Sequence, residues 1–223
     1  MLQGKIDMLE YIPSISFGKD STAMLLMMIE HNESIHSVLW FDTEREFPEI
    51  RTHAAKVVSD TGVKLQVVRH WAGFDFLEDR YGRPHPSGGW CTAAKRDCCN
   101  KYIRLMRKDN PDIVECIGYS ADEQKRADKM SKKWPVRFPL IEWGITEKMA
   151  LEYCYDHGYF FGGIYDWMPS KRVSCYNCPK QGPKDWAAIL KHHPELFPYN
   201  HTLERTPKSS ASQLNRYTPY ERR

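Results

Sequence analysis

The chain has 223 residues and a formal net charge of +3, a length that suits one sizeable hydrophobic core rather than two independent domains. No stretch approaches the roughly 20 continuous apolar residues of a membrane helix, and no secretion signal is recognisable, so we expect a cytoplasmic protein without a membrane segment. The small net charge does not by itself indicate nucleic-acid binding. The seven cysteines are an odd number, which favours reduced thiols or metal ligands over disulfides.

Strand and helix patterns alternate along the chain. In order, apolar runs and 3.6-residue periodicity predict strand 11–17, helix 21–30, strand 37–42, helix 47–58, strands 63–68 and 112–118, and helix 145–157 with Thr146 as its cap. Pro13 has no backbone N–H to donate to a neighbouring strand, so we expect it near the start of its strand. Residues 73–90, rich in glycine and proline, are expected to be irregular. The pattern indicates a doubly wound, mainly parallel α/β sheet, which binds ligands beyond the carboxyl ends of its strands.

Residues 16–22, SFGKDST, join the first strand to the first helix. Unpaired N–H groups at a helix N-terminus favour an anion such as phosphate, and Gly18, Lys19 and three hydroxyls suit that ligand. The segment lacks the second glycine and the Gly-Lys-Ser/Thr ending of a Walker loop. An ordinary helix cap, in which Asp20 or Ser21 satisfies the backbone donors, explains the same residues equally well.

SFGKDST resembles the pyrophosphate-binding loop, Ser-x-Gly-x-Asp-Ser, of the adenine nucleotide alpha-hydrolase (PP-loop) superfamily, and specifically of its phosphoadenosine-phosphosulfate reductase family. Four further blocks similar to that family follow in order, FDTEREFPE, WCTAAK, IGYSADEQKR and PLIEWGITEKMALEYCYDHG. The resemblance implies a five-stranded parallel sheet, with residues 1–179 as a PP-loop nucleotide-binding domain. The sheet is followed by a C-terminal cysteine-bearing extension, and residues 180–223 form a C-terminal helix and an extended basic tail.

The resemblance also implies which residues bind an adenine nucleotide. They are Ser16, Phe17, Gly18, Lys19, Asp20, Ser21 and Thr22 at the phosphates, together with Asp42, Thr43, Gly118, Asp122, Glu123 and Arg126. Lys19, Asp20 and Asp42 are the candidate catalytic residues, because Lys19 can offset charge on a departing pyrophosphate while an aspartate places Mg²⁺. The full Lys-Asp-Ser run favours ATP as the nucleotide. Glu44 replaces a commoner glycine, and Tyr119 stands in place of the usual arginine.

Five cysteines are candidate metal ligands: Cys91, Cys98, Cys99, Cys175 and Cys178. The Cys-x-x-Cys pair at 175 and 178 can bind one metal from a single turn, and a second segment can complete four-coordination. The resemblance favours a [4Fe–4S] cluster over zinc, held by Cys91, Cys175, Cys178 and either Cys98 or Cys99, although Trp90 occupies the first position of the family's Cys-Cys pair. Thiols without a metal are the third alternative. Cys116 and Cys154 are expected in the core.

Residues 125–137 form a basic segment. Its cations are Lys125, Arg126, Lys129, Lys132, Lys133 and Arg137, with Trp134 among them. Such a segment can neutralise substrate phosphates or follow a nucleic-acid backbone with the tryptophan stacked on a base, and a solvated loop is an equal alternative. Arg216, Arg222 and Arg223 in the tail are weaker candidates.

Three functions remain open at this point. The first is a PP-loop ATP pyrophosphatase or sulfotransferase-like enzyme that cleaves ATP to AMP and pyrophosphate to activate a substrate, including a nucleic acid, for thiolation. Its sulfur donor would be a cysteine desulfurase or a thioredoxin-like protein. The second is a sulfonucleotide (PAPS or APS) reductase that releases sulfite, an oxidoreductase whose usual C-terminal cysteine has no counterpart after Cys178. The third is a non-catalytic binding subunit, and a homodimer is the candidate assembly.

Overall fold

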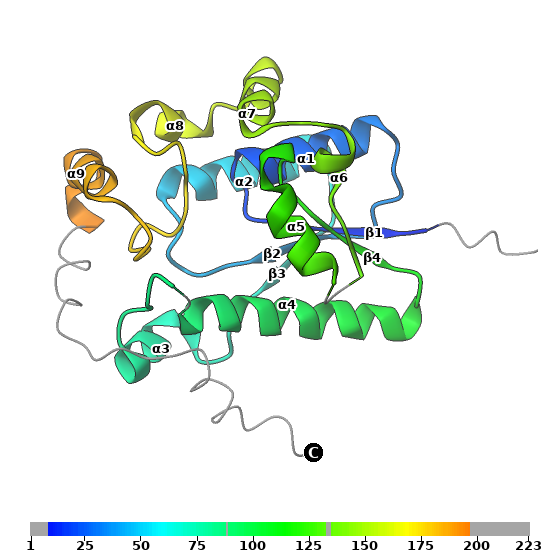
Figure 1. Cartoon of the computed structure of the whole chain (residues 1–223), viewed down its shortest axis with the longest axis horizontal. Coiled ribbons are helices and arrows are strands. Elements are labelled where there is room, and N and C mark those ends of the chain that lie inside the picture. The colour runs from blue at the N-terminus through cyan, green and yellow to red at the C-terminus, as the bar shows by residue number, and fades with distance from the viewer. Residues whose placement is uncertain (1–8, 88, 133–134, 197–223) are drawn as a thin grey trace, which may run out of the picture. The chain divides into compact units, whose positions relative to one another are not determined.

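The computed structural model describes residues 9–87, 89–132 and 135–196. In chain order the elements are β1 (Tyr11–Ile15), α1 (Lys19–Glu30), β2 (Val38–Phe41), α2 (Pro48–Thr61), β3 (Leu65–Val68), α3 (Gly73–Tyr81), α4 (Trp90–Asp109), β4 (Val114–Ile117), η1 (Ala121–Glu123), α5 (Gln124–Ser131), β5 (Val136–Arg137), α6 (Pro139–Glu142), α7 (Glu147–Asp156), η2 (Phe161–Gly163), α8 (Ile164–Trp167), α9 (Pro183–His192) and η3 (Pro194–Leu196) (Figure 1). The predictions for Lys133, Trp134 and the basic tail, including Arg216, Arg222 and Arg223, lie outside the described residues.

The described residues group into two compact units, each assembled from separate stretches of sequence. Unit 1 takes residues up to 40, then 52–67 and 101–160. Unit 2 takes residues 41–51, 68–100 and those from 161 onward. Each unit therefore brings together residues that are far apart in the chain. The domain boundary expected between residues 179 and 180 stays a prediction.

A five-stranded sheet in the order β3-β2-β1-β4-β5 forms the centre of unit 1. β1 pairs in parallel with β2 and β4, and β4 pairs in parallel with β5. All four residues of β2 are buried, as expected for an apolar strand covered on both faces. Figure 1 shows α1 and residues 101–109 of α4 on opposite faces of the sheet. The predicted doubly wound parallel α/β fold with five strands is confirmed.

Pro13 lies in the middle of β1, not near its start as the sequence suggested. On the β2 side, Tyr11 bridges Ile35, whereas the regular ladder begins only at Ser14 opposite Leu39. Pro13 thus falls at a shift of register, where the partner segment contains one extra residue. A missing N–H costs little at such an irregularity, because no ladder bond is due there.

Residues 73–81 form α3 instead of the irregular stretch that we expected. Phe74 and Leu77 are buried on one face of this helix, and Phe74 lies against Phe41, with ring centroids 5.8 Å apart. The helix ends at Gly82, whose φ of 71° is readily reached only by glycine. The glycines and prolines that suggested irregularity therefore belong mainly to the loop after α3. The long helix α4 was not predicted either.

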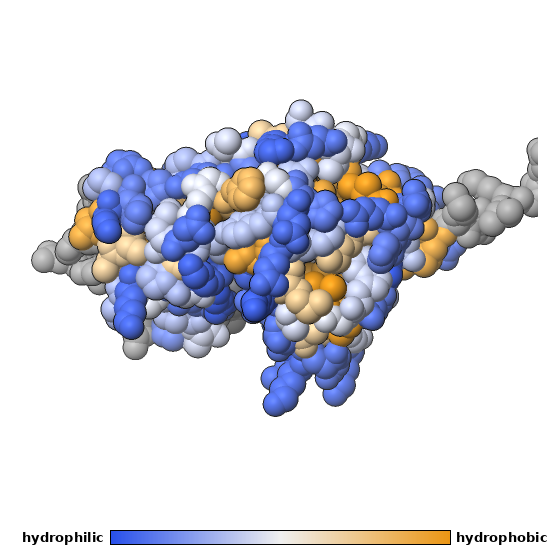
Figure 2. Space-filling model, turned by 90° about the horizontal axis from the view of Figure 1, so that it is seen from above, coloured by the Kyte–Doolittle hydropathy of each residue, from blue (hydrophilic) through white to orange (hydrophobic). Residues whose placement is uncertain are grey.

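Hydrophilic residues cover most of the face shown in Figure 2, and the hydrophobic ones form small separate areas on it. Within the described ranges, no helix combines the length and the apolar character that crossing a bilayer requires.

Candidate functional site

The loop between β1 and α1 makes a sharp, strained turn in unit 1. Phe17 adopts a φ of 58°, a left-handed conformation that costs a non-glycine residue about 1 kcal/mol. Its side chain is fully buried and lies edge-on to Trp40 at 5.1 Å between ring centroids, so burial of the ring offsets the strain. Gly18 follows as the N-cap of α1, with no side-chain cap. The first N–H groups of α1 are therefore presented without a capping side chain, which suits an anion.

Ser21 and Gly118 hold this loop in shape. The Ser16 N–H donates to Ser21 Oγ at 3.2 Å, and Ser21 Oγ donates to the Gly18 carbonyl at 3.1 Å. Gly118 follows β4, and a Cβ at this position would lie 2.9 Å from Ser21 Cα and 3.1 Å from Ser21 N. A larger residue would displace the start of α1, so Gly118 supports the loop by its close approach.

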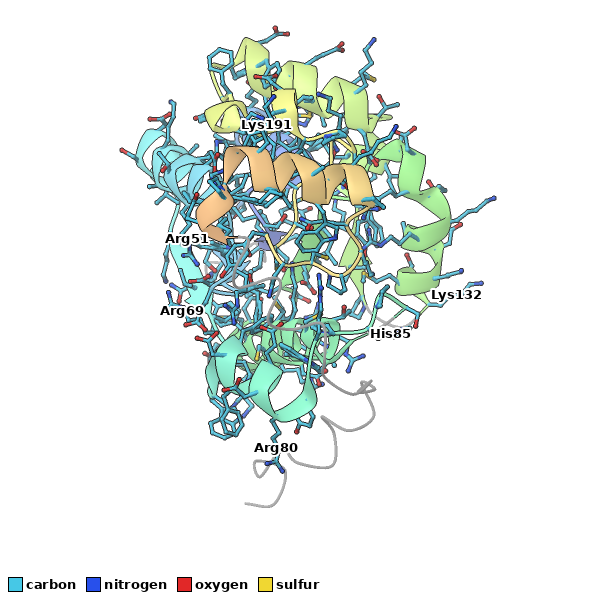
Figure 3. The ribbon with its side chains drawn as sticks, turned by 90° about the vertical axis from the view of Figure 1, so that its left-hand side faces the viewer. Arg51, Arg69, Arg80, His85, Lys132 and Lys191 are labelled. Atoms are coloured by element: carbon cyan, nitrogen blue, oxygen red, sulfur yellow. The ribbon has the colours of Figure 1, made fainter. Side chains whose placement is uncertain are left out.

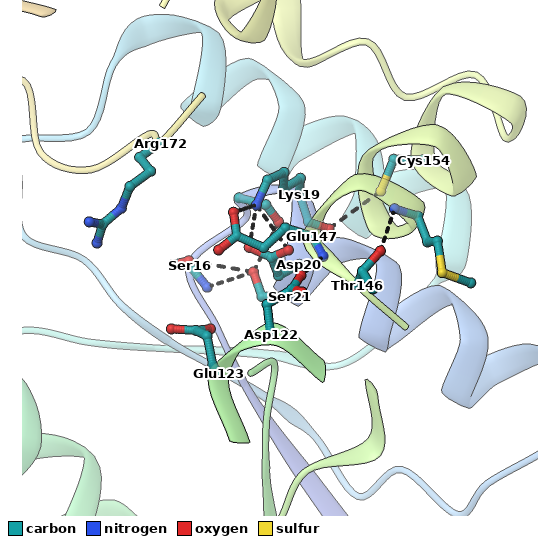
Figure 4. Close-up of polar contacts among 12 residues, drawn as sticks. Ser16, Lys19, Asp20, Ser21, Asp122, Glu123, Thr146, Glu147, Cys154 and Arg172 are labelled. Carbon is teal, nitrogen blue, oxygen red and sulfur yellow. Dashed lines mark hydrogen bonds and ion pairs between the residues drawn. The ribbon is translucent and has the colours of Figure 1, made fainter. Parts of the chain in front are cut away.

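Lys19 lies between two carboxylates at the start of α1 (Figure 4). Its Nζ is 2.8 Å from Asp20 Oδ2 and 2.9 Å from Glu147 Oε2, and its side chain is only 6% exposed. Burial raises the pKa of Asp20, and the neighbouring Lys19 ammonium only partly opposes that effect. Glu147, the first residue of α7, is a member of this group that sequence reasoning missed. The only feature of the sequence that pointed to Glu147 was its position directly after the expected cap, Thr146.

The segment after β4 contributes a second set of contacts in unit 1. Asp122 Oδ2 accepts a hydrogen bond from the Glu147 N–H at 2.8 Å, so this carboxylate helps to begin α7. Glu123 pairs with Arg126 at 2.6 Å. The Arg126 guanidinium lies 4.2 Å from the centre of the Tyr119 ring. Tyr119, which replaces the usual arginine, thus serves as a platform for Arg126.

Thr22 points into unit 1 rather than toward solvent. It is fully buried, and its Oγ1 lies 3.1 Å from His53 Nε2. Burial, followed by the charge of Lys56, lowers the pKa of His53 to about 4, so the ring is neutral near pH 7. The hydroxyl of Thr22 therefore fixes the loop to α2, whereas Ser16 is exposed.

Asp42 and Thr43 belong to unit 2. Asp42 is 1% exposed, and its carboxylate accepts hydrogen bonds from the Glu44 N–H, from Arg51 at 2.9 Å and from Arg69 at 2.7 Å. Burial alone would raise the pKa of Asp42, but these hydrogen bonds lower it. Figure 3 shows Arg51 and Arg69, which sequence reasoning missed, on the same side of the molecule. The Asp42 oxygens are thus already engaged by two cations.

Glu44 explains why a glycine is common at its position. Its φ is 63°, in the left-handed region that glycine reaches without strain. Glu44 Oε2 accepts a hydrogen bond from the Phe74 N–H at 3.3 Å, at the start of α3. This contact compensates for part of the backbone cost.

In unit 2, Cys178 interacts electrostatically with two other candidate cysteines, Cys91 and Cys175. The Cys175 thiol donates to Thr43 Oγ1 at 3.3 Å, and the Cys178 N–H donates to the Cys175 carbonyl at 3.0 Å. Burial, and then the nearby Glu46 carboxyl, raise the pKa of Cys175. Burial also raises the pKa of Cys91, and the charge of Cys178 adds to that effect. The thiols of Cys91 and Cys175 are therefore protonated near pH 7.

Cys98 and Cys99 lie further along α4, and their place among the candidate ligands stays a prediction. Cys98 follows Cys91 by seven residues of the same helix, about 10 Å along its axis at 1.5 Å per residue. Across the described ranges, no three His, Cys, Asp or Glu side chains are arranged to hold a metal ion. Trp90 is buried, and its Nε1 donates to the Gly82 carbonyl at 2.8 Å, so it belongs to the core. Binding of a cluster or zinc would therefore require these cysteine side chains to move closer together.

A buried ionic network lies beneath the Cys-x-x-Cys turn. Arg45 pairs with Glu78 at 3.2 Å and with Asp75, and it donates to Tyr176 Oη at 3.2 Å. Asn177 donates to Glu78 Oε1 at 3.3 Å. Burial is the largest effect on Glu78 and raises its pKa to about 7, although Arg45 opposes it. Sequence reasoning missed this network, because its members are spread over more than 130 residues.

The basic segment carries fewer uncompensated charges than its sequence suggests. Arg126 pairs with Glu123, and Arg137 pairs with Glu33 at 2.6 Å and with Glu142 at 2.8 Å. Lys125, Lys129 and Lys132 are its exposed lysines within the described residues, and Figure 3 shows Lys132 extending outward.

Comparisons with known proteins give one family. The family model for the phosphoadenosine phosphosulfate reductase domain matches residues 10–181. An uncharacterised protein of Methanocaldococcus jannaschii is 23% identical over 203 residues, which cover 82% of this chain and 39% of that protein. The chain thus spans about two fifths of the length of this relative.

Two solved structures are similar at low identity. One is the U34-tRNA thiolase NcsA from Methanococcus maripaludis with its [4Fe-4S] cluster, 15% identical, with a TM-score of 0.48 and coverage of 90% of this chain and 74% of that chain. The other is the NMN synthetase from Francisella tularensis, 12% identical, with a TM-score of 0.40 and coverage of 90% and 89%.

Proposed function

This chain belongs to the phosphoadenosine phosphosulfate reductase domain family, and from that premise we propose that it binds ATP at residues 16–22 and cleaves it into AMP and pyrophosphate. The cleavage would activate a substrate for sulfur transfer. The observation that carries the proposal is the α1 N-terminus, which has no side-chain cap and has Lys19 at its first position.

The chemistry follows from the charge that develops on the leaving group. A substrate oxygen attacks the α-phosphorus, the bond from that phosphorus to the bridging oxygen breaks, and pyrophosphate leaves with the electron pair. The N–H groups of the first turn of α1 and the Lys19 ammonium would stabilise this anion. A sulfur nucleophile can then attack the substrate carbon that carries the adenylylated oxygen. AMP leaves with that oxygen, so sulfur replaces oxygen on the substrate.

Magnesium is the metal ion that this reaction would use. It binds mainly through substrate phosphates and one or two carboxylates, so a complete protein cage is not required. Asp20, within the loop of residues 16–22, is the carboxylate that we propose for it. Asp42 is a second candidate, although its oxygens already accept hydrogen bonds from Arg51 and Arg69. The ion would offset phosphate charge.

The proposed reaction is tested by product analysis. Purified protein incubated with Mg²⁺ and ATP, with and without candidate substrates, is expected to release AMP and pyrophosphate in equal amounts. Sulfite released from PAPS or APS with thioredoxin would instead establish the sulfonucleotide reductase alternative. Nucleotide binding with neither product would establish a non-catalytic binding subunit.

The cysteines carry a separate proposal, a [4Fe–4S] cluster with zinc as the alternative metal. The proposed ligands are Cys91, Cys175 and Cys178, which interact electrostatically, together with Cys98 or Cys99. Anaerobic purification followed by iron, zinc and absorption analysis is expected to give iron that Cys175→Ser removes. Cys116→Ser is the matched control and should keep the metal, because Cys116 is a core residue of β4 and not a proposed ligand. Wild-type protein without iron and without brown colour would contradict the cluster.

The proposed reaction requires a sulfur donor and a second substrate. A sulfur donor such as a cysteine desulfurase or a thioredoxin-like protein would supply the sulfur. A nucleic-acid substrate would contact the exposed Lys125, Lys129 and Lys132. A homodimer remains the candidate assembly.

A further inference from the structure

Glu147 is fixed in place by contacts on each side of it. Its N–H donates to Asp122 Oδ2 at 2.8 Å, and the preceding Thr146 accepts a hydrogen bond from the Met149 N–H at 3.3 Å as the N-cap of α7. Its carboxylate lies 2.9 Å from Lys19 Nζ. Further along α7, the Cys154 thiol donates to the Lys19 carbonyl at 3.4 Å. The helix that carries Glu147 is therefore tied to both the backbone and the side chain of Lys19.

The two carboxylates on Lys19 differ in how easily they can be displaced. Asp20 is adjacent in sequence, accepts through both oxygens, and its side chain is 25% exposed. Glu147 accepts through one oxygen and is 45% exposed. A more hydrated carboxylate loses less when its ion pair breaks, because water can replace the ammonium. Glu147 is thus the partner that an incoming anion would displace first.

We propose that Glu147 is a positioning residue. Its carboxylate pairs with the Lys19 ammonium in the absence of nucleotide, and a phosphate oxygen replaces it there when nucleotide binds. The inference rests on the proposed function, since it concerns the same loop. Glu147 holds the ammonium at the N-terminus of α1 while the loop is empty. It then competes with the pyrophosphate group for that ammonium, which weakens binding and favours release of pyrophosphate after cleavage.

The test uses inorganic pyrophosphate with Mg²⁺ and the full chain, by isothermal titration calorimetry at fixed ionic strength. Glu147→Gln removes the competing charge and keeps a side-chain oxygen that can accept from Lys19. The dissociation constant of pyrophosphate is expected to fall about fivefold in this variant, the effect of one partly exposed ion pair. A residue with a merely structural role would weaken binding on substitution, not tighten it.

Two further variants separate the loss of the contact with Lys19 from the loss of negative charge on α7. Glu147→Asp preserves the negative charge in the first turn of α7 but is one methylene too short to reach Lys19, so it should also tighten binding without loss of stability. Glu152→Gln, on the same helix and paired with Lys148 at the surface, should bind like the wild type.

The outcomes separate the two proposals. Wild-type binding with unchanged or weaker binding in both Glu147 variants would overturn the role of Glu147 and leave the proposed function standing. Binding by the variants alone would support the competition directly. An absence of pyrophosphate binding in every protein would overturn both the role of Glu147 and the proposed function.

Discussion

Replacing Lys19 by methionine is expected to reduce ATP cleavage by about 100-fold or more, the usual effect of removing one preorganised charge from a transition state. Methionine keeps most of the volume of the buried side chain but removes the ammonium that we propose for the departing pyrophosphate. The rate of pyrophosphate release at saturating Mg²⁺ and ATP measures the effect.

Lys148→Met is the matched control, because Lys148 is 85% exposed and pairs only loosely with Glu152, at 3.6 Å. It should keep wild-type activity. The loss of Lys19 also removes the ammonium that opposes the effect of burial on Asp20, so the pKa of Asp20 should rise further. Thermal unfolding should confirm that Lys19→Met is folded. Full activity in a folded variant would contradict the role proposed for Lys19.

Stability should depend on pH through Glu78. Its pKa lies at about 7 in the folded chain against an ordinary value of 4.5, because the carboxyl is buried. Between these two values the folded chain holds a proton that the unfolded chain has released. The free energy of unfolding therefore falls as the pH rises through this window, by about 3 kcal/mol at most. The favourable contribution is complete below pH 4.5 and lost above pH 7.

Urea unfolding at pH 5, 6.5 and 8 measures this dependence. Glu78→Gln cannot ionise, so the stability difference between the wild type and this variant should shrink or reverse as the pH rises. Asp109→Asn, at the exposed last position of α4, should follow the wild-type slope. Equal slopes in the wild type and Glu78→Gln would show that Glu78 does not titrate in this range.

The pH dependence of stability through Glu78 should also affect the turn that contains Cys175 and Cys178. Asn177, which lies between Cys175 and Cys178, donates to this carboxyl, and Arg45 accepts the Tyr176 N–H at its carbonyl. The network that responds to pH is thus the one that holds the Cys-x-x-Cys turn in place.

Short-range patterns were enough to predict most of the sheet and the loop. Strands buried on both faces appear in a sequence as continuous apolar runs, and β2 and β4 lie inside the predicted runs. The Thr146 cap is confirmed, because capping involves residues only three positions apart. The family was also readable, since its blocks are contiguous stretches. By contrast, α3 was missed because the glycines and prolines of the following loop dominated the composition of residues 73–90.

The sequence by itself determined the α/β class, the loop at residues 16–22 and the family, because each depends on neighbouring residues. Only the tertiary structure decided which distant side chains meet. Glu147 reaches Lys19 across 128 positions, and Asn177 reaches Glu78 across 99. Such pairings depend on how helices and strands pack, and no local pattern of residues encodes that packing.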